Sequence, residues 1–282
     1  MEIVWVHNFS YPKYVGGAEL TDFYWIKKGI ELRLKISEIR CGSPFKAGDV
    51  YMFGNFGKFN LQDLERKING KPYICIVHGG LITKEVVDIY DKARALVCMS
   101  PNQQKRLLNM TKNKRIIVTP PYIDTRLFYN FKKPRVSKSY LYVGAIREHK
   151  GIRIILEHAK KHLESNYHFY GPTKKKEIYL LEMIKSQPNC SYHGLVLNDH
   201  IPDIMNKYKT FIWYLDPNYN DFESFGRTVI EALLCGMRLE INRKNFGAFS
   251  WNWDFNHPRE IAKKLEYFYS KFWDNALKVF EN

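Results

Sequence analysis

The sequence has few cysteines and lacks any cysteine pairing motif. Its five cysteines are widely spaced and none belongs to a CxxC pair: Cys41, Cys75, Cys98, Cys190 and Cys235. An even set at close spacing would be typical of a disulfide framework, and this set is neither even nor close. Cys75 and Cys98 lie in apolar, strand-like runs. The pattern therefore predicts reduced thiols that pack inside a cytoplasmic protein.

A leader segment and long apolar runs are also missing. The first residues, MEIVWVHN, already have a strand pattern, so we expect no signal peptide. Since no apolar run has the length needed to span a bilayer, any membrane contact should be peripheral, at the inner face. The many lysines and aromatic residues fit a viral origin, in which case host cytoplasm is the expected location.

Acidic residues are outnumbered by basic ones. The chain has 282 residues, with 44 Lys and Arg against 29 Asp and Glu, which gives a net charge of +15. Such an excess favours polyanionic partners, although it also serves solubility alone. The basic residues form short clusters at 112–115, 132–138 and 174–176 and no basic tail. We therefore expect an acidic acceptor or surface, either anionic membrane or DNA, and infer no protein partner.

Short apolar runs alternate with longer amphipathic ones along the chain. In the first half the predicted strands include EIVWVHN, DVYMFG, PYICIVHGG, ALVCMSP and RIIVTPP. A Pro-containing, charged stretch without periodicity follows, and the alternation restarts at SYLYVGAI. Alternating strands and helices are typical of a parallel sheet covered by helices on both faces. The sequence therefore predicts an α/β protein with two Rossmann-like, doubly wound domains.

The change of rhythm sets the expected domain boundaries. Residues 1–120 should form the first domain, 121–138 a linker, 139–260 the second domain, and 261–282 a helix that packs back towards the first domain. Two such domains would face each other across a cleft. Ligands of open α/β sheets bind beyond the carboxyl ends of the strands, so functional residues should directly follow strands.

Three loops that follow predicted strands carry candidate residues. Gly16 and Gly17 open a helix, where glycines allow close backbone approach and N–H groups favour an anion. The segment VGAIREHKGI places Arg147 and Lys150 before another helix, and such side chains suit a diphosphate. An ordinary helix start and a solvated basic loop would explain these two motifs equally well. His78 ends a strand and should therefore face the cleft.

The stretch NDFESFGRTVIEALLCGMRL carries two carboxylates with seven residues between them. Glu223 precedes a helix predicted over 224–235, next to its positive end. Glu231 lies among the apolar residues of that helix, so it should be partly buried and needs a partner. A pair of sugar hydroxyls would supply one, because a carboxylate accepts two hydrogen bonds. Helix-end charge for Glu223 and a surface position for Glu231 are the alternatives.

Asp221 and Glu223 have the spacing of an acidic metal-binding pair. They stand in a polar loop, and no second acidic or histidine cluster supports them. We therefore expect neither a metal site nor a bound cofactor.

Taken in order, these motifs resemble the retaining glycosyltransferases of family 4, which have the GT-B fold. The resemblance covers almost the whole chain. It rests on GGAE after the first strand, a strand-end histidine, and the segments VTPPYIDTRLF, VGAIREHKG, HGLVLNDHIPDIM and ESFGRTVIEALLCG. The last segment matches the family's Glu-x7-Glu signature and is the most specific.

The resemblance implies roles at the donor site. Glu231 would bind the ribose hydroxyls, Glu223 would contact the transferred sugar, and Lys150 would hold the diphosphate leaving group. Around them, further contacts are implied with the phosphates (Gly16, Gly17), the sugar or acceptor (His78), the sugar and phosphates through the backbone (Phe225, Gly226), and the base (Leu195, Val196, Leu197).

One position departs from the family. Its diphosphate loop usually has an arginine directly after the glycine, where this chain has Ala145. Arg147 or Arg227 would have to replace it. The first domain is also short for the family, and that domain normally binds the acceptor.

The resemblance implies a metal-independent, retaining transfer of a hexose or pentose from a UDP-, GDP- or ADP-type sugar. The acceptor expected first is a surface or lipid-linked glycan. The alternatives are a modified base of phage DNA as acceptor, or a sugar-nucleotide-binding protein with weak catalysis. The base, the sugar, the acceptor and the oligomeric state are left open by the sequence.

Overall fold

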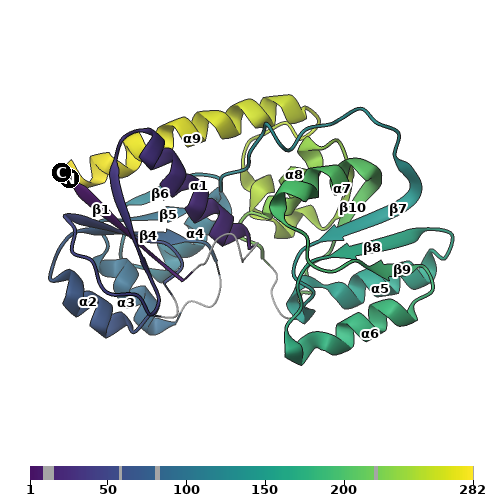
Figure 1. The fold of residues 1–282 in the computed structure, drawn as a ribbon, viewed down its shortest axis with the longest axis horizontal. Coiled ribbons are helices and arrows are strands. Elements are labelled where there is room, and N and C mark those ends of the chain that lie inside the picture. Colours follow the sequence, from purple (N-terminus) through teal and green to yellow (C-terminus); the bar gives the residue numbers. More distant parts are fainter. Residues whose placement is uncertain (9–15, 57–58, 80–82, 219–221, 282) are drawn as a thin grey trace. The chain divides into compact units, whose positions relative to one another are not determined.

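The computed structural model describes residues 1–8, 16–56, 59–79, 83–218 and 222–281. The chain forms two compact units: residues 1–122 with 264–282, and residues 123–263. Each unit is built on one parallel sheet with helices on both of its faces (Figure 1). This arrangement confirms the predicted α/β class with two Rossmann-like domains.

Unit 1 has a parallel sheet whose described strands follow the order β2-β1-β3-β4-β5-β6. Its elements are β1 (Glu2–His7), α1 (Gly17–Glu31), β2 (Lys35–Arg40), β3 (Val50–Phe53), α2 (Leu61–Ile68), β4 (Tyr73–Val77), α3 (Lys84–Lys92), β5 (Ala95–Cys98), α4 (Pro101–Met110) and β6 (Ile116–Val118). Every residue of β3, β4 and β5 is buried, because both faces of the sheet are covered.

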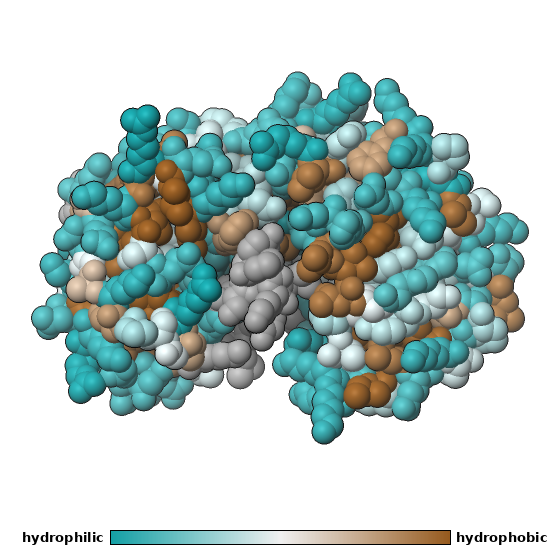
Figure 2. Space-filling model, viewed as in Figure 1, coloured by the Kyte–Doolittle hydropathy of each residue, from teal (hydrophilic) through white to brown (hydrophobic). Residues whose placement is uncertain are grey.

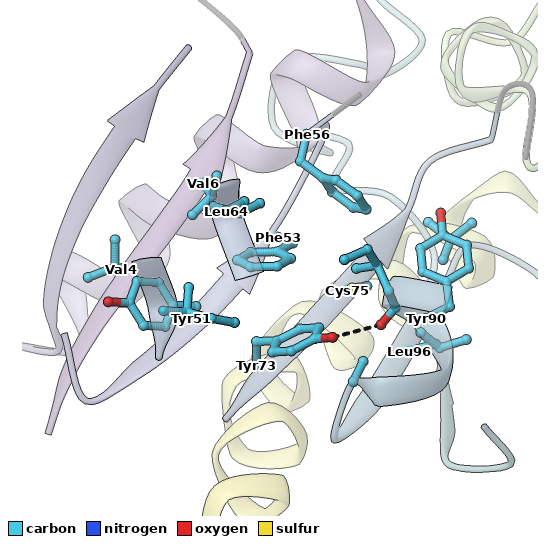
Figure 3. Close-up of a cluster of buried hydrophobic side chains, with 14 of the residues drawn as sticks. Val4, Val6, Tyr51, Phe53, Phe56, Leu64, Tyr73, Cys75, Tyr90 and Leu96 are labelled. Atoms are coloured by element: carbon cyan, nitrogen blue, oxygen red, sulfur yellow. Dashed lines mark hydrogen bonds between the residues drawn. The ribbon is translucent and has the colours of Figure 1, made fainter. Parts of the chain in front are cut away.

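Alternate residues of these strands form two separate cores. On one face, Val4, Phe53 and Cys75 pack against residues of α2 and α3, such as Leu64 and Tyr90 (Figure 3). The Tyr73 hydroxyl lies in this cluster and donates a hydrogen bond to the Ile89 carbonyl at 2.9 Å. Period-two alternation of buried side chains therefore fixes which helices lie on this face.

The other face of the unit 1 sheet carries an aromatic core. The rings of Trp25 and Phe272 stack with centroids 4.1 Å apart, and Trp5 meets Trp273 edge to face at 5.9 Å. The Trp273 indole N–H donates to the Trp25 carbonyl at 3.0 Å. The C-terminal part of α9 (Pro258–Glu281) therefore packs with α1 in this unit.

Unit 2 repeats the architecture with the strand order β11-β10-β7-β8-β9. Its elements are β7 (Val136–Val143), α5 (Ile152–Lys161), β8 (Asn166–Tyr170), α6 (Ile178–Ser186), β9 (Cys190–Tyr192), α7 (Ile201–Lys207), β10 (Tyr208–Trp213), α8 (Arg227–Leu234) and β11 (Arg238–Ile241), followed by the start of α9. Short 3-10 helices at Glu148–Lys150 and Asn198–His200 precede α5 and α7.

The strand orders place one topological switch point in each sheet. From β7 the chain proceeds to β8 and β9, and then returns to β10 on the other side of β7. In unit 1 it goes from β1 to β2 and then to β3 on the opposite side. Crevices form at the carboxyl ends of such strand pairs, which makes β7/β10 and β1/β3 the expected ligand positions.

Surface hydropathy, helix character and the cysteines are described last. Hydrophilic residues predominate on the face shown in Figure 2, with small separate hydrophobic patches over both units. Among the described helices, none combines the length and apolar character required to cross a membrane. The cysteines are all free thiols; Cys41 is exposed and the other four are buried.

Candidate functional site

The loop that holds Glu223 is fixed by pairing with the segment after β11. The Glu223 amide donates to the Asn245 carbonyl at 2.8 Å, and the Glu223 carbonyl accepts from the Gly247 amide at 2.8 Å. Gly226 then turns the chain into α8 with a φ of 84°, and a Cβ there would lie 2.6 Å from the Phe246 ring. Only glycine fits both the positive φ and the close Phe246 ring, so Gly226 sets the start of α8.

Lys150 and Glu223 form an ion pair. The Lys150 Nζ lies 2.5 Å from Glu223 Oε2, and the side chains are 21% and 23% exposed. The ammonium also lies 5.0 Å from the centroid of the Trp213 ring. Lys150 follows β7 and Glu223 follows β10, so the pair stands at the switch point of unit 2. Two residues predicted separately are thus brought together.

The turn after Lys150 needs a glycine. Gly151 has a φ of 70°, and a Cβ on it would lie 1.8 Å from the Tyr214 carbonyl oxygen at the end of β10. This close approach of the two strand ends brings Lys150 to Trp213, whose indole N–H donates to the Lys150 carbonyl at 3.1 Å. The glycine therefore helps to place the cation beside Glu223.

Arg147 belongs to the same basic cluster. Burial lowers the pKa of His149, and the like charges of Lys150 and Arg147 lower it further, against the opposing effect of Glu177 and Glu223. The Arg147 Nε is buried and has no hydrogen-bond partner among the described residues. Cationic groups thus converge on this loop, and together with burial they favour the neutral form of His149.

Glu231 is paired within its own helix. Its Oε1 lies 2.5 Å from the Arg227 Nε, and the two side chains are 3% and 7% exposed. The predicted burial of Glu231 is confirmed, and its partner in the structure is Arg227, four residues earlier. The Nη1 and Nη2 atoms of Arg227 are buried without partners among the described residues. Helix α8 therefore begins with a guanidinium whose hydrogen-bonding capacity is only partly used.

The segment predicted to line the base pocket joins β9 to the following 3-10 helix. Leu195 and Leu197 are exposed, at 49% and 50%, and Val196 is half-buried. Asn198 comes next; it is 7% exposed, and its Nδ2 has no partner among the described residues. Sequence reasoning missed Asn198, because nothing in the pattern marks it as buried.

The Gly-Gly loop of unit 1 starts α1. The Gly16 amide donates to Glu19 Oε2 at 3.0 Å, and Gly17 is the first residue of the helix. A carboxylate of the chain thus already accepts one of the N–H groups that we predicted to favour phosphate. Both glycines belong to unit 1, whereas the basic cluster belongs to unit 2.

His78 directly follows β4 and contacts an acid from α1. Its Nε2 lies 2.7 Å from Asp22 Oδ1, with the two side chains 8% and 2% exposed. His7, at the end of β1, makes the same type of contact with Glu38, also at 2.7 Å. Unit 1 therefore has two imidazoles, each paired with a carboxylate, at the carboxyl ends of its strands.

A pocket of about 420 Å³ lies in unit 1 between α1 and the ends of β1 and β2. Its lining includes four carboxylates, two cations, one imidazole and three apolar side chains: Glu19, Asp22, Glu31, Glu38, Lys27, Arg40, His7, Phe23, Ile26 and Ile30. The pocket is thus more acidic than the chain as a whole.

Asp221, the first member of the acidic pair in the loop, lies outside the described residues. Within the described part of the chain, no group of three or more His, Cys, Asp or Glu residues could hold a metal ion.

Comparison with known proteins gives a family for part of the chain. Residues 126–239 match the family model described as "Glycosyl transferases group 1". The matched region contains the Lys150–Glu223 pair, the basic cluster and the Arg227–Glu231 pair. No curated protein sequence matches the chain significantly.

Solved structures share the fold at low sequence identity. HepE of Anabaena, in complex with UDP and glucose, has a TM-score of 0.65 and 15% identity, over 88% of this chain and 82% of that one. An alpha-glucosyltransferase in complex with UDP and a 13-mer DNA containing an HMU base has a TM-score of 0.63 and 12% identity. That match covers 99% of this chain and 94% of the other.

A third similar structure is longer than this chain. The pneumococcal O-GlcNAc transferase GtfA, in complex with UDP and GlcNAc, has a TM-score of 0.63 and 14% identity, and the match covers 83% of this chain but only 57% of GtfA. These likenesses support the fold, and the family model supports the activity. The chain therefore has the GT-B fold, and its residues 126–239 match the glycosyl transferases group 1 family model, which supports glycosyltransferase activity.

Proposed function

We propose that the chain transfers a sugar from a nucleotide-diphosphate sugar to an acceptor hydroxyl, with retained stereochemistry and without a metal ion or cofactor. The Lys150–Glu223 pair carries the proposal. It joins a cation and a carboxylate, both partly exposed, at the switch point of the group 1 domain. That position is where open α/β sheets bind ligands.

The proposed chemistry assigns opposite tasks to the two members of the pair. Negative charge grows on the diphosphate as the sugar leaves, and fixed cations stabilise that charge. Lys150 supplies one, and Arg147 supplies a second from the same loop. Glu223 turns to the sugar, where a carboxylate favours the developing positive character at the anomeric carbon. Donor binding would then separate the two side chains, with phosphate taking the place of Glu223 beside Lys150.

The nucleotide is proposed to lie along the start of α8 and the segment after β9. Glu231 would accept hydrogen bonds from the ribose hydroxyls. The terminal nitrogens of Arg227 would donate hydrogen bonds to oxygen atoms of the bound nucleotide. The exposed side chains of Leu195 and Leu197 would cover one face of the base. Burial of these apolar groups against a flat ring would contribute to donor affinity.

A surface or lipid-linked glycan is the acceptor proposed first. A lipid-linked acceptor would place the enzyme at the inner face of the membrane, where a net charge of +15 favours anionic lipid. DNA is the second candidate. It is favoured by the near-complete coverage, 99% and 94%, shared with the glucosyltransferase whose complex contains DNA. The same positive charge would then serve phosphate contacts.

The donor assignment can be tested by thermal stability. A ligand that binds the folded state raises its apparent melting temperature. We expect one of UDP, GDP and ADP, and one of its sugar conjugates, to raise the melting temperature of the full chain. Lys150→Ala should reduce the increase, whereas the exposed-lysine variant Lys174→Ala should retain it. If no nucleotide diphosphate or sugar conjugate changes the melting temperature, the proposed donor class is wrong.

The acceptor classes are separated by binding at rising salt. Duplex DNA, phosphatidylglycerol vesicles and neutral vesicles that carry a glycolipid are compared with the same purified chain. Preference for DNA that weakens steeply with salt would favour the second candidate, and binding to glycolipid vesicles at high salt would favour the first.

A further inference from the structure

His149 lies in the 3-10 turn that carries the cationic side chains of unit 2. The Lys150 amide closes this turn by donating to the Arg147 carbonyl at 3.1 Å. The Gly151 amide donates to the Glu148 carbonyl at 2.9 Å and closes it a second time. The imidazole is half-buried, so part of its surface is open. His149 therefore stands between the two cations that are proposed to hold the diphosphate.

A buried carboxylate from a neighbouring segment anchors this turn. Glu177, directly before α6, is 8% exposed, and its Oε1 accepts a hydrogen bond from the Glu148 amide at 3.3 Å. Its other oxygen, Oε2, is buried and has no hydrogen-bond partner among the described residues. The loop before the turn is held as well, since the Ile146 amide donates to the Pro172 carbonyl at 2.8 Å. The turn is thus fixed beside a carboxylate that has an unused oxygen.

Charged groups of both signs act on the His149 ring. Burial has the largest effect and lowers the pKa of His149 from its usual value of 6.5. Lys150 and Arg147, the cations of its own turn, lower this pKa further. Glu177 and Glu223, from the segments before α6 and α8, act in the opposite direction. The neutral ring is therefore favoured while two carboxylates match the two cations.

A bound diphosphate would change this balance of charge. Each phosphate of a nucleotide sugar is esterified on both sides and carries about one negative charge, as in DNA. Donor binding is proposed to turn the single charge of Glu223 away from Lys150, so two negative charges arrive where one departs. Added negative charge favours the charged form of a neighbouring imidazole. An imidazolium also has two N–H donors for phosphate oxygens, whereas a neutral ring has one.

We propose that His149 is a third diphosphate-binding residue, whose imidazole takes up a proton from solvent as the nucleotide sugar binds and then donates a hydrogen bond to a phosphate oxygen. The inference rests on the proposed function, in which Lys150 and Arg147 hold the diphosphate. It adds a binding residue and makes donor affinity depend on pH. Affinity should rise as the pH falls through the pKa of His149 in the complex, and should level off below the lower pKa of the free protein.

Calorimetric titration of the full chain measures the proton uptake directly. The probe is UDP-glucose, GDP-mannose or ADP-glucose, whichever raises the melting temperature most. A nucleotide sugar is used because a terminal phosphate would itself titrate near pH 6. Titrations at pH 7 in two buffers of different ionisation enthalpy should show uptake of about half a proton or more. The association constant should increase about tenfold from pH 8 to pH 6.

Three variants assign the proton to one residue. In His149→Gln, proton uptake should fall to nearly zero and the affinity should lose its pH dependence. The control His162→Gln removes an imidazole that is 44% exposed at the C-terminal end of α5, and it should behave as the wild type. Glu177→Gln keeps an acceptor for the turn but removes a negative charge, so the rise in affinity should move to lower pH.

Melting temperatures show whether each variant is folded, and Glu177→Gln decides if His149→Gln is not. Constant affinity between pH 8 and pH 6 in the wild type, or undiminished proton uptake in His149→Gln, would overturn the role of His149 and leave the proposed donor function intact. An imidazolium at His149 in the free protein at pH 7, measured by ¹⁵N-histidine NMR, would also contradict it. If none of the three nucleotide sugars binds, the proposed donor function is wrong, and the role of His149 is wrong with it.

Discussion

The buried Arg227–Glu231 ion pair leads to a prediction about stability. Both side chains are almost fully shielded, so removal of either one leaves an uncompensated charge in the interior. Glu231→Ala should therefore lower the free energy of unfolding by about 3–5 kcal/mol and also weaken donor binding. Chemical denaturation and donor titration measure the two effects.

A double variant separates stability from binding at this pair. Arg227→Met with Glu231→Leu replaces both charges by apolar groups, and we expect it to recover most of the lost stability. Donor binding should stay weak, because no carboxylate is left for the ribose. Recovery of donor affinity in the double variant would show that Glu231 does not bind the nucleotide.

The Lys150–Glu223 pair leads to a prediction about turnover. Lys150→Ala should lower kcat by about 100-fold, since leaving-group stabilisation by one fixed cation is typically worth that much. Stability should change by less than about 1 kcal/mol, because the pair is partly exposed. The control Lys176→Ala removes an exposed lysine of the same unit. Equal kcat in both variants would remove Lys150 from the mechanism.

The Lys150–Glu223 and Arg227–Glu231 ion pairs differ in how far the sequence predicts them. The positions of Lys150 and Glu223 after strands could be read from the apolar runs, but their ion pair joins residues 73 apart in the sequence and depends on the strand order. Arg227 and Glu231 have the spacing of a helical pair, which was visible in the sequence. We nevertheless predicted sugar hydroxyls as the partner of Glu231, because a buried internal pair cannot be told from an exposed one by spacing alone.

At the scale of elements, α8 depends on its first turn. Gly226 has a φ of 84°, and a Cβ added there would lie 2.6 Å from the Phe246 ring. Gly226→Ala should cost about 2–4 kcal/mol in unfolding free energy, from the left-handed backbone and the overlap together. Gly194→Ala, with a φ of 82° and no atom within 4 Å of the added Cβ, should cost only about 1 kcal/mol. Equal losses would mean that the ring contact is not tight.

Strand prediction succeeded where both faces of a strand are covered and failed at one edge. The runs YICIV in β4 and ALVC in β5 are fully buried and apolar, so they were recognisable. The edge strand β2, KISEIR, has one fully buried residue and was missed. It is polar because only one neighbour pairs with it and much of it remains accessible. The predicted helix over 224–235 also began too early, since the residues before Arg227 pair with the loop after β11.

For the whole molecule, the half-buried His168 should make stability depend on pH. Burial lowers the pKa of His168 to about 4, with further lowering by His193 and Lys207. The unfolded chain binds this proton near pH 6.5, so stability is intact above that pH and falls as pH drops towards 4. The loss should be on the order of 1 kcal/mol after solvent screening, or a melting temperature lower by a few degrees.

Two histidine variants test whether His168 causes this loss of stability at low pH. His168→Gln should flatten the decline of melting temperature between pH 7 and 5, whereas His200→Gln, an exposed position in the same unit, should leave the slope as in the wild type. A wild-type slope in His168→Gln would contradict the assignment.

The whole enzyme should also work without divalent metal. Because Lys150 and Arg147 are proposed to neutralise the diphosphate, transfer should continue at an unchanged rate in EDTA after removal of metal by dialysis. Product analysis by proton NMR of the anomeric coupling reports retention in the same sample. An absolute requirement for Mg²⁺ or Mn²⁺ would contradict the proposed mechanism.

Helix α9 starts in unit 2, and its residues from 264 onwards belong to unit 1. On the ribosome, the residues of unit 2 are therefore all made before unit 1 has its final helix. Until Phe272 and Trp273 emerge, the aromatic face formed by Trp5 and Trp25 has no cover. Nascent chains usually fold from the N-terminus onwards. In this protein the aromatic core of unit 1 can be completed only after all residues of unit 2 have been synthesised, although unit 1 comes first in the sequence.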